Sequence, residues 1–269
     1  MSAPAQPARV NVLGVGVSAV NRQTSVSLIL EAMERRQRGY IAVTSVHGVM
    51  EAQADARFRT ILNSSFLCVP DGVPLFWIGR LAGHRQISRV YGPDLMLDVC
   101  RASVPGGYRH FVYGGKPGVA RELSRCLSAR FSGLNIVGAY EPPFRPLNAQ
   151  EEAELSAQVA AVRPDVLWVG LSTPKQERFM AEYLPRLDVT LMIGVGAAFD
   201  IHTGRTTQAP RWVRHAGFEW LYRLCHEPRR LWRRNLLNLW FLPLAAGQWC
   251  GLKTYNPSLI STGSERSRS

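Results

Sequence analysis

An aspartate and a threonine end two of the most apolar short segments of the chain. Asp71 follows segment 66–69 by one residue, and Thr44 closes segment 40–44. A carboxylate at the end of a buried strand can take a proton from a hydroxyl, and a hydroxyl at a helix start can donate to a phosphate or sugar oxygen. Both residues could instead cap the helices that follow, and for Asp71 position alone favours the cap.

Two further stretches place anion-binding groups before expected helices. Arg89 stands just before a helix start, where it could bind a diphosphate or pair with a surface acid. Gly114 and Gly115 form a turn between an expected strand and an expected helix. This turn is similar to a phosphate-cradling loop, although it matches neither of the common glycine-rich motifs, and a plain tight turn would have the same sequence.

The segment 170–177 carries a lysine where a helix is expected to begin. Thr173 can cap that helix and Pro174 fits its first position, so Lys175 and Gln176 fall in the first turn. A cation is mildly unfavourable at the positive end of a helix. A bound anion would offset that cost, which predicts a negatively charged ligand here.

Positive charge is plentiful and metal ligands are not. The formal net charge is +12, lysine occurs only at positions 116, 175 and 253, and segment 205–235 holds eight arginines against two glutamates. No Asp-x-Asp pair occurs, and none of the five cysteines is spaced as C-x-x-C. We therefore expect no metal and no cofactor, with phosphate charge met by arginine, lysine and backbone N–H groups.

The elements that must position these residues alternate along the chain. Short apolar runs predict buried strands and the longer amphipathic segments between them predict helices, which indicates a largely parallel, Rossmann-like α/β sheet with helices on both faces. In such sheets ligands bind at the carboxyl ends of the strands. The expected strands are 10–15, 40–44, 66–69, 110–114, 134–140, 165–170 and 189–196, and the expected helices are 24–37, 49–63, 74–83, 92–102, 118–131, 149–162 and 174–187.

The chain changes character after about residue 204. Five of its seven tryptophans follow, and segment 219–242 has helical periodicity with a break expected at Pro228. Arginine beside tryptophan and leucine is typical of an interfacial membrane helix, while the apolar stretch 236–249 is too short, and interrupted by Pro243, to span a bilayer. We predict a loose tail (1–9), a catalytic core (10–204), a membrane-associating appendage (205–255) and a disordered tail (256–269). The residues predicted to contact the membrane, or a substrate held in it, are Trp220, Arg229, Arg230, Trp232, Arg233, Arg234 and Trp240.

Taken together and in order, these stretches resemble the WecG/TagA/CpsF family of bacterial glycosyltransferases. The resemblance covers about residues 10–235. It rests on VPDGVPLFW, ISRVYGPDL, FVYGGKPGV, STPKQERFM, GVGAAFDIHTG and APRWVRHAGFEWLYRLCHEPRRLWRR.

The resemblance implies an inverting, metal-independent transfer from a UDP-sugar to a polyprenyl-diphosphate-linked acceptor. It places the family's catalytic aspartate at Asp71, its strand-end threonine at Thr44, and its arginine and glutamine at Arg89 and Gln176. It also implies an appendage that seats the enzyme on the cytoplasmic face of the membrane and brings arginines to the site. Among these we expect two to bind the donor diphosphate, Arg214 and Arg223.

Two departures from the family pattern bear on the donor. Val46 stands where members that transfer N-acetylmannosamine have asparagine, and Gln208 stands where an arginine often precedes Ala-Pro. The chain looks closest to the xanthan-type exopolysaccharide branch, so we predict glucose transfer from UDP-glucose to a lipid-linked glucose. Transfer of N-acetylmannosamine or its uronic acid is the alternative. A basic nucleic-acid-binding module is suggested by the pI of about 10.1, but no nucleic-acid motif appears.

Overall fold

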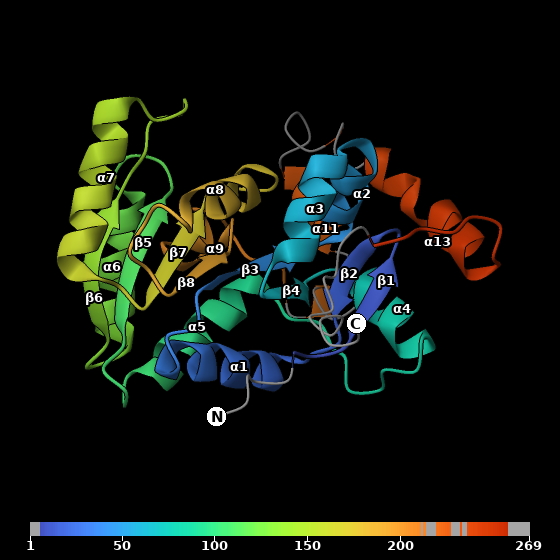
Figure 1. The fold of residues 1–269 in the computed structure, drawn as a ribbon, viewed down its shortest axis with the longest axis horizontal. Coiled ribbons are helices and arrows are strands. Elements are labelled where there is room, and N and C mark those ends of the chain that lie inside the picture. The colour runs from blue at the N-terminus through green and yellow to red at the C-terminus, as the bar shows by residue number, and fades with distance from the viewer. Residues whose placement is uncertain (1–5, 211, 214–218, 227–231, 233–235, 258–269) are drawn as a thin grey trace, which may run out of the picture.

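The computed structural model describes residues 6–210, 212–213, 219–226, 232 and 236–257. Within them a six-stranded parallel sheet has the order β4-β3-β8-β7-β5-β6 (Figure 1). The predicted α/β class and six of the seven predicted strands are confirmed. The strands are β3 (Gly39–Thr44), β4 (Leu67–Pro70), β5 (Arg109–Gly114), β6 (Asn135–Tyr140), β7 (Val166–Gly170) and β8 (Leu191–Gly194).

The prediction for segment 10–15 was wrong. It is not a strand of the main sheet but most of a hairpin, in which β1 (Arg9–Val12) pairs antiparallel with β2 (Val15–Ser18). Leu13 and Gly14 form the two-residue turn with φ values of 51° and 84°. Such left-handed turns match the twist of a hairpin, but Leu-Gly is not among the usual signals for one. Arg9, assigned above to a loose tail, begins β1, and its guanidinium donates to Asn63 O at 2.9 Å.

The seven helices predicted in the core are present, and one of them is divided in two. The segment 49–63 is two helices, because Asp55 ends the first and its carboxylate accepts from the Phe58 N–H of the second at 3.0 Å. A short helix after β8, α9, was not predicted. The helices of the described residues include α1 (Arg22–Glu34), α2 (Val46–Ala54), α3 (Ala56–Ser64), α4 (Val73–Leu81), α5 (Gly92–Ser103), α6 (Val119–Arg130), α7 (Ala149–Val162), α8 (Lys175–Tyr183), α9 (Ala198–His202), α11 (Glu219–His226) and α13 (Phe241–Trp249).

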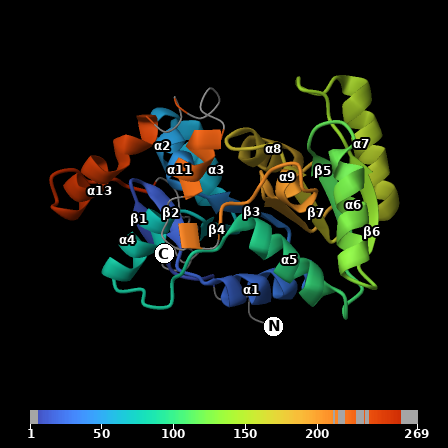
Figure 2. The same cartoon turned by 180° about the vertical axis from the view of Figure 1, so that it is seen from behind.

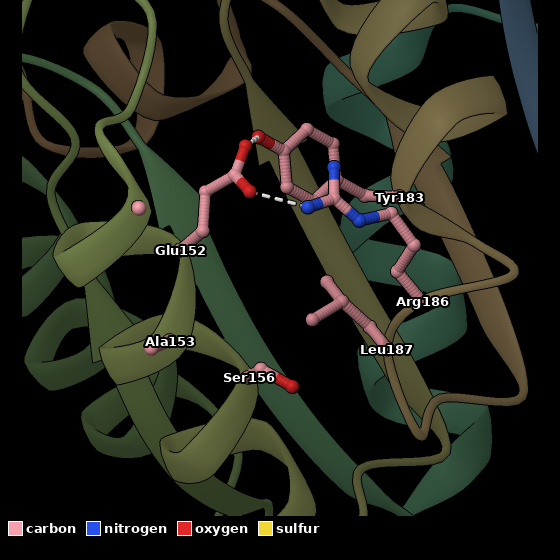
Figure 3. Close-up of a pocket in the computed structure, with 7 residues that line it drawn as sticks. Glu152, Ala153, Ser156, Tyr183, Arg186 and Leu187 are labelled. Carbon is pink, nitrogen blue, oxygen red and sulfur yellow. Dashed lines mark hydrogen bonds and ion pairs between the residues drawn. The ribbon is translucent and has the colours of Figure 1, made fainter.

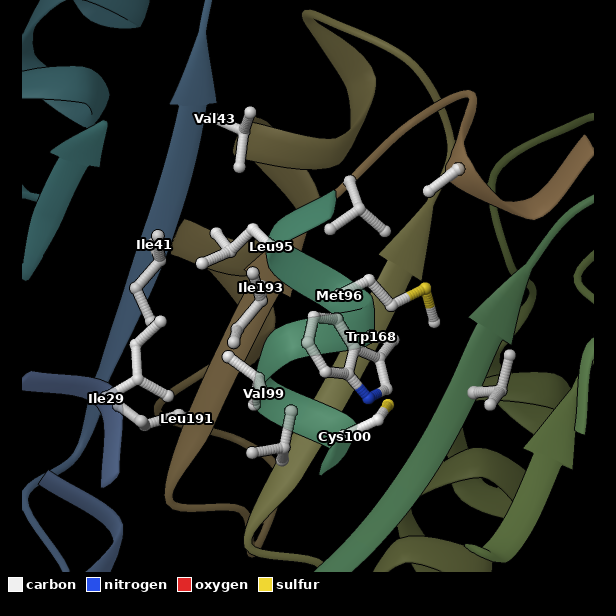
Figure 4. Close-up of a cluster of buried hydrophobic side chains, with 14 of the residues drawn as sticks. Ile29, Ile41, Val43, Leu95, Met96, Val99, Cys100, Trp168, Leu191 and Ile193 are labelled. Carbon is white, nitrogen blue, oxygen red and sulfur yellow. The ribbon is translucent and has the colours of Figure 1, made fainter. Parts of the chain in front are cut away.

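Side chains that alternate along the strands pack into two hydrophobic cores, one on each face of the sheet. Ile41 and Trp168 pack on one face with α1, α5, α6 and α9 (Figure 4), whereas Tyr40 and Leu167 pack on the other face with α7 and α8. Both faces of a parallel sheet are covered in this way, which is why its strands are nearly continuous apolar runs. A third cluster joins the β1–β2 hairpin to α2, α3 and α4.

The end of the described chain packs on that hairpin. Phe241 is 1% exposed in the hairpin cluster, and Gln248 donates to Asn11 O and accepts from Leu13 N at 2.9 and 2.8 Å. Pro243, predicted to interrupt the apolar stretch, lies inside the first turn of α13. Its missing N–H costs no intrahelical hydrogen bond there, and the interruption falls at Trp240 instead.

No helix in the described part of the chain is long and apolar enough to cross a membrane.

Candidate active site

Asp71, Thr44 and Arg89 meet at the carboxyl ends of the adjacent strands β4 and β3. The Asp71 N–H donates to Thr44 O at 2.8 Å. The Arg89 guanidinium donates to Asp71 twice, from Nε to the backbone O at 2.5 Å and from Nη2 to Oδ1 at 3.2 Å. The same guanidinium lies 4.7 Å from the centre of the Tyr91 ring. An arginine and an aromatic ring therefore fix a carboxylate at the edge where ligands bind in sheets of this kind.

The capping interpretation of Asp71 does not hold. Helix α4 begins at Val73, its N-cap is Gly72, and no side chain caps it. Asp71 lies one residue too early, and its carboxylate is instead paired with Arg89, with side-chain exposures of 24% and 21%. The alternative considered for Arg89, an ion pair with an acid, is thus present, and the acid is the predicted catalytic residue.

Thr44 is buried behind this pair. It is 2% exposed, and its Oγ1 accepts a hydrogen bond from Cys68 Sγ at 3.2 Å. Burial raises the pKa of the Cys68 thiol, which keeps it protonated as the donor. Neither Thr44 nor Ser45 caps α2, since Ser45 is at the N-cap position without a side-chain hydrogen bond.

Gln176 lies next to the end of β8 and is almost fully buried. It is 3% exposed, and a Cβ added to Gly194 would lie 3.0 Å from Gln176 Cδ. Its Nε2 donates to Glu177 Oε1 at 3.0 Å, while its Oε1 is buried without a hydrogen-bond partner among the described residues. A buried amide oxygen without a partner is costly, so this atom is well placed to accept from a ligand.

The prediction that Thr173 caps α8 was wrong. Pro174 is the N-cap, and the Thr173 hydroxyl donates to Glu177 Oε1 at 2.8 Å instead. A Cβ added to Gly48 would lie 3.2 Å from Thr44 Cγ2 and 3.8 Å from Thr173 Cγ2. Gly48 thereby lets the first turn of α8 approach the Thr44 end of the site.

Five helix N-termini at this edge lack a side-chain cap. These are α2, α4, α5, α8 and the short α9, whereas α1, α3 and α7 are capped by Asn21, Asp55 and Asn148. The start of α5 belongs to the same edge, because a Cβ added to Gly92 would lie 3.4 Å from Val43 Cγ1. Uncapped N–H groups at the positive ends of helices are favourable partners for an anion. The exposed Lys175 at the start of α8 adds a cation.

Gly114 and Gly115 lie at the same edge of the sheet but apart from the Asp71–Arg89 pair. Their strand β5 lies three strand spacings from β3, about 14 Å away. Gly114 has φ 122°, and a Cβ there would lie 2.8 Å from Gly170 O, so glycine is required by the turn itself. The following helix start is occupied by Glu141, whose carboxylate accepts from Gly118 N at 2.8 Å. A plain tight turn accounts for these glycines, and a carboxylate already lies at the helix start.

The structure also contains a hollow of about 290 Å³ between α7 and α8, away from every predicted site residue (Figure 3). Glu152, Tyr183 and Arg186 point toward one another across it and are hydrogen bonded. These polar groups satisfy one another, so the hollow is the outer surface of a packed helix pair. It is lined by Ala149, Glu152, Ala153, Ser156, Tyr183, Arg186 and Leu187.

The appendage residues are only partly described. Trp220, Trp232 and Trp240 are exposed, at 47%, 48% and 65%. Arg223 is part of α11. The other predicted appendage arginines lie outside the described residues: Arg214, Arg229, Arg230, Arg233 and Arg234. No group of three histidine, cysteine, aspartate or glutamate side chains in the described ranges could hold a metal ion.

Sequence analysis missed three residues of the site: Cys68, Tyr91 and Glu177. Glu177 is the most informative, since it is 1% exposed and holds both Thr173 and Gln176. A glutamate in the first turn of a helix is ordinarily a solvent-exposed partner of the helix dipole, so nothing in its position marks it as buried. Cys68 and Tyr91 are equally ordinary as a strand residue and a residue before a helix.

The chain is similar to known glycosyltransferases. Residues 10–255 match the model of the glycosyl transferase WecG/TagA/CpsF family. An N-acetylglucosaminyldiphosphoundecaprenol N-acetyl-beta-D-mannosaminyltransferase of Bacillus subtilis (strain 168) is 30% identical over 68% of this chain and 69% of its own. The protein of the same name from Bacillus spizizenii (strain ATCC 23059 / NRRL B-14472 / W23) is 28% identical over 76% of this chain and 77% of its own.

These relatives bear on the donor expected above. Their names specify an N-acetylmannosaminyl donor group, and neither names glucose or an exopolysaccharide, so they do not support the prediction of a xanthan-type glucosyltransferase. The family itself was identified from the motifs, and the match extends over the predicted core and the whole predicted appendage. This chain belongs to the glycosyl transferase WecG/TagA/CpsF family.

Proposed function

We propose that this glycosyltransferase moves an N-acetylmannosaminyl group from a UDP-sugar to N-acetylglucosamine carried on a polyprenyl diphosphate. The observation that carries the proposal is the Asp71–Arg89 pair at the strand ends, next to Thr44 and Gln176. The chain is also similar over more than two thirds of its length to two enzymes named for that reaction.

In the proposed mechanism Asp71 is the general base. Its carboxylate accepts the proton of the acceptor hydroxyl while that oxygen attacks the anomeric carbon and the bond from that carbon to the donor diphosphate breaks. The names of the relatives specify a β-linked mannosaminyl product. From an α-linked UDP-sugar, the donor we assume here, such a product requires attack opposite the leaving group and therefore inversion. Arg89 orients the carboxylate through hydrogen bonds to Oδ1 and to the backbone O of Asp71.

The leaving UDP is stabilised without a metal in this proposal. The uncapped N-termini of α2, α4 and α8 and the exposed Lys175 are groups that can meet the diphosphate as negative charge develops on it. Arginines of the appendage would add cations to this set. The sequence has no Asp-x-Asp pair that could hold a metal ion on the diphosphate. The expectation of metal-independent transfer is tested by adding a chelator.

A second candidate donor, UDP-glucose, rests on Val46. Val46 is the first residue of α2, and its N–H lies 3.2 Å from the position a Cβ on Gly72 would take, beside Asp71. A valine offers no hydrogen bond to an acetamido group. The Val46 side chain is also half-buried and packs against the hairpin cluster, however, so we favour the donor of the relatives.

We place the enzyme on the cytoplasmic face of the membrane. A polyprenyl-diphosphate acceptor is held in a lipid bilayer, and the exposed tryptophans of the appendage suit the interfacial zone. The family match also favours an enzyme over the nucleic-acid-binding alternative.

Donor competition tests the proposal. Purified protein is incubated with short-chain polyprenyl-diphosphate N-acetylglucosamine and equal amounts of UDP-N-acetylmannosamine and UDP-glucose, and the product is identified by mass. A disaccharide with two acetamido groups is expected. A product carrying a plain hexose would replace the donor assignment with glucose, and no product from any UDP-sugar would refute the proposed function.

A further inference from the structure

Helix α4 presents large apolar side chains to solvent. Trp77 is 53% exposed and Leu81 is 66% exposed, while Leu75 on the opposite side is fully buried. The exposed Arg80 guanidinium lies 5.3 Å and 5.7 Å from the ring centres of Phe76 and Trp77. An arginine lying over aromatic rings beside exposed leucine is the composition of a helix at a membrane interface.

The exposed charge on α4 and on the loop that follows it is positive. Between Asp71 and Asp94 the chain contains three arginines and no acid. Arg89 is paired with Asp71, so the charge that faces a lipid surface is that of Arg80 and Arg85. Arg80 and Arg85 are exposed. Each basic residue near an anionic lipid surface contributes about 1 kcal/mol of attraction, so this segment is complementary to such a surface.

Helix α4 shares one end of the molecule with α13. Both helices contribute to the cluster around the β1–β2 hairpin, Ile78 from α4 and Phe241 from α13, and both views place them on either side of that hairpin (Figures 1 and 2). The outer side of α13 also exposes apolar residues, with Leu242 at 67% and Trp249 at 61%. The apolar surface of α4 thus continues the one predicted for the appendage.

We propose that α4 is a second lipid-contacting helix, with Trp77 and Leu81 inserted into the interface of an anionic bilayer. The helix starts two residues after Asp71 and extends about 12 Å to Leu81. With Asp71 at the start of α4 and Trp77 and Leu81 inserted in the bilayer at its other end, the candidate active site would be held close to the membrane surface, where the diphosphate of a lipid-linked acceptor lies. This inference rests on the proposed function for its acceptor, but the lipid contact is measured without turnover.

Vesicle flotation tests the lipid contact. The variant Trp77→Gln/Leu81→Gln is compared with the intact chain on vesicles of phosphatidylglycerol and phosphatidylcholine. Phe144→Gln is the matched control, because Phe144 is 81% exposed in the loop between β6 and α7, at the opposite end of the molecule. We expect the double variant to partition at least about tenfold more weakly, equal to about 1.4 kcal/mol, and the control to float like the intact chain.

A second variant and an activity measurement keep the inference open to refutation. Arg85→Glu changes an exposed charge and should weaken flotation on the anionic vesicles but not on pure phosphatidylcholine. The double variant should lose turnover of a long-chain acceptor in vesicles and keep turnover of a short-chain acceptor in solution.

Flotation of the double variant equal to that of the intact chain would overturn the inference. A second result would also overturn it: the intact chain forms a concentration-dependent dimer, and the double variant abolishes the dimer without changing flotation. The apolar surface of α4 would then bind a second copy of the chain and not lipid. If the intact chain floats but transfers no sugar, the proposed function fails while the lipid contact stands.

Discussion

Replacing Asp71 by asparagine separates its chemical role from its structural one. The amide oxygen can still accept from Arg89, so the substitution removes a charge and not a contact. Hydrogen bonds to charged groups contribute about 1 kcal/mol more than neutral ones, and the two side chains are about three-quarters buried, at 24% and 21% exposure. We expect a loss of about 1 kcal/mol of unfolding free energy, or about 2–4 °C in Tm.

Turnover should fall much further than stability. An amide cannot accept the proton of the acceptor hydroxyl, and loss of a general base costs about 10²- to 10⁴-fold, or about 3–5 kcal/mol in activation free energy. The assay is transfer to a short-chain lipid-linked acceptor, with UDP binding measured in parallel by calorimetry. Turnover should collapse while the affinity for UDP changes little.

Asp98→Asn is the matched control. The Asp98 side chain is 19% exposed and its carboxylate lies 2.6 Å from Arg22 Nε, so the same substitution removes the charge from another arginine-paired carboxylate, between α5 and α1. This variant should lose comparable stability and no turnover. If Asp71→Asn keeps the turnover of Asp98→Asn, Asp71 only orients Arg89 and the assignment of the base is wrong.

Three further outcomes are expected. Gly114→Ala should unfold at a clearly lower urea concentration than the control Gly83→Ala. Both glycines have positive φ, but only at Gly114 would an added Cβ meet the backbone, 2.8 Å from Gly170 O. Equal unfolding midpoints would show that this close approach does not require glycine. Burial lowers the pKa of His110 to about 4, while the same imidazole in the unfolded chain is protonated near pH 6.5. The free energy of unfolding should therefore fall by up to about 3 kcal/mol as the pH drops from 6.5 to 4. If His110→Gln shows the same pH dependence of stability as the intact chain, this reasoning is wrong. Transfer should survive EDTA, and its loss in chelator with recovery on added Mg²⁺ or Mn²⁺ would end the metal-free mechanism.

The strands of the sheet were predictable because each is a short apolar run buried on both faces. The β1–β2 hairpin was not, since its turn residues Leu13 and Gly14 carry no strong signal and the run looks continuous. The prediction that Thr173 caps α8 was wrong because a local pattern did not reveal a tertiary contact. A threonine before a proline at a helix start suggests a cap, whereas the hydroxyl is drawn to the buried carboxylate of Glu177.

The site was predictable as a set of strand ends but not as a set of contacts. Asp71 and Thr44 follow apolar runs, so parallel topology alone brings them to one edge. The pairing of Arg89 with Asp71 links residues 18 positions apart, and the Glu141 carboxylate reaches Gly118 across 23 positions. Such contacts depend on how the loops close, which local sequence patterns do not report.

The crystal structure of a UDP complex tests the central claim most directly. The claim is that the carboxyl ends of β3, β4 and β8 hold the donor, with Asp71 as the base beside it. The account predicts the diphosphate of UDP at the N-termini of α2, α4 and α8, near Lys175. A diphosphate bound at the turn of Gly115, or in the hollow between α7 and α8, would contradict it.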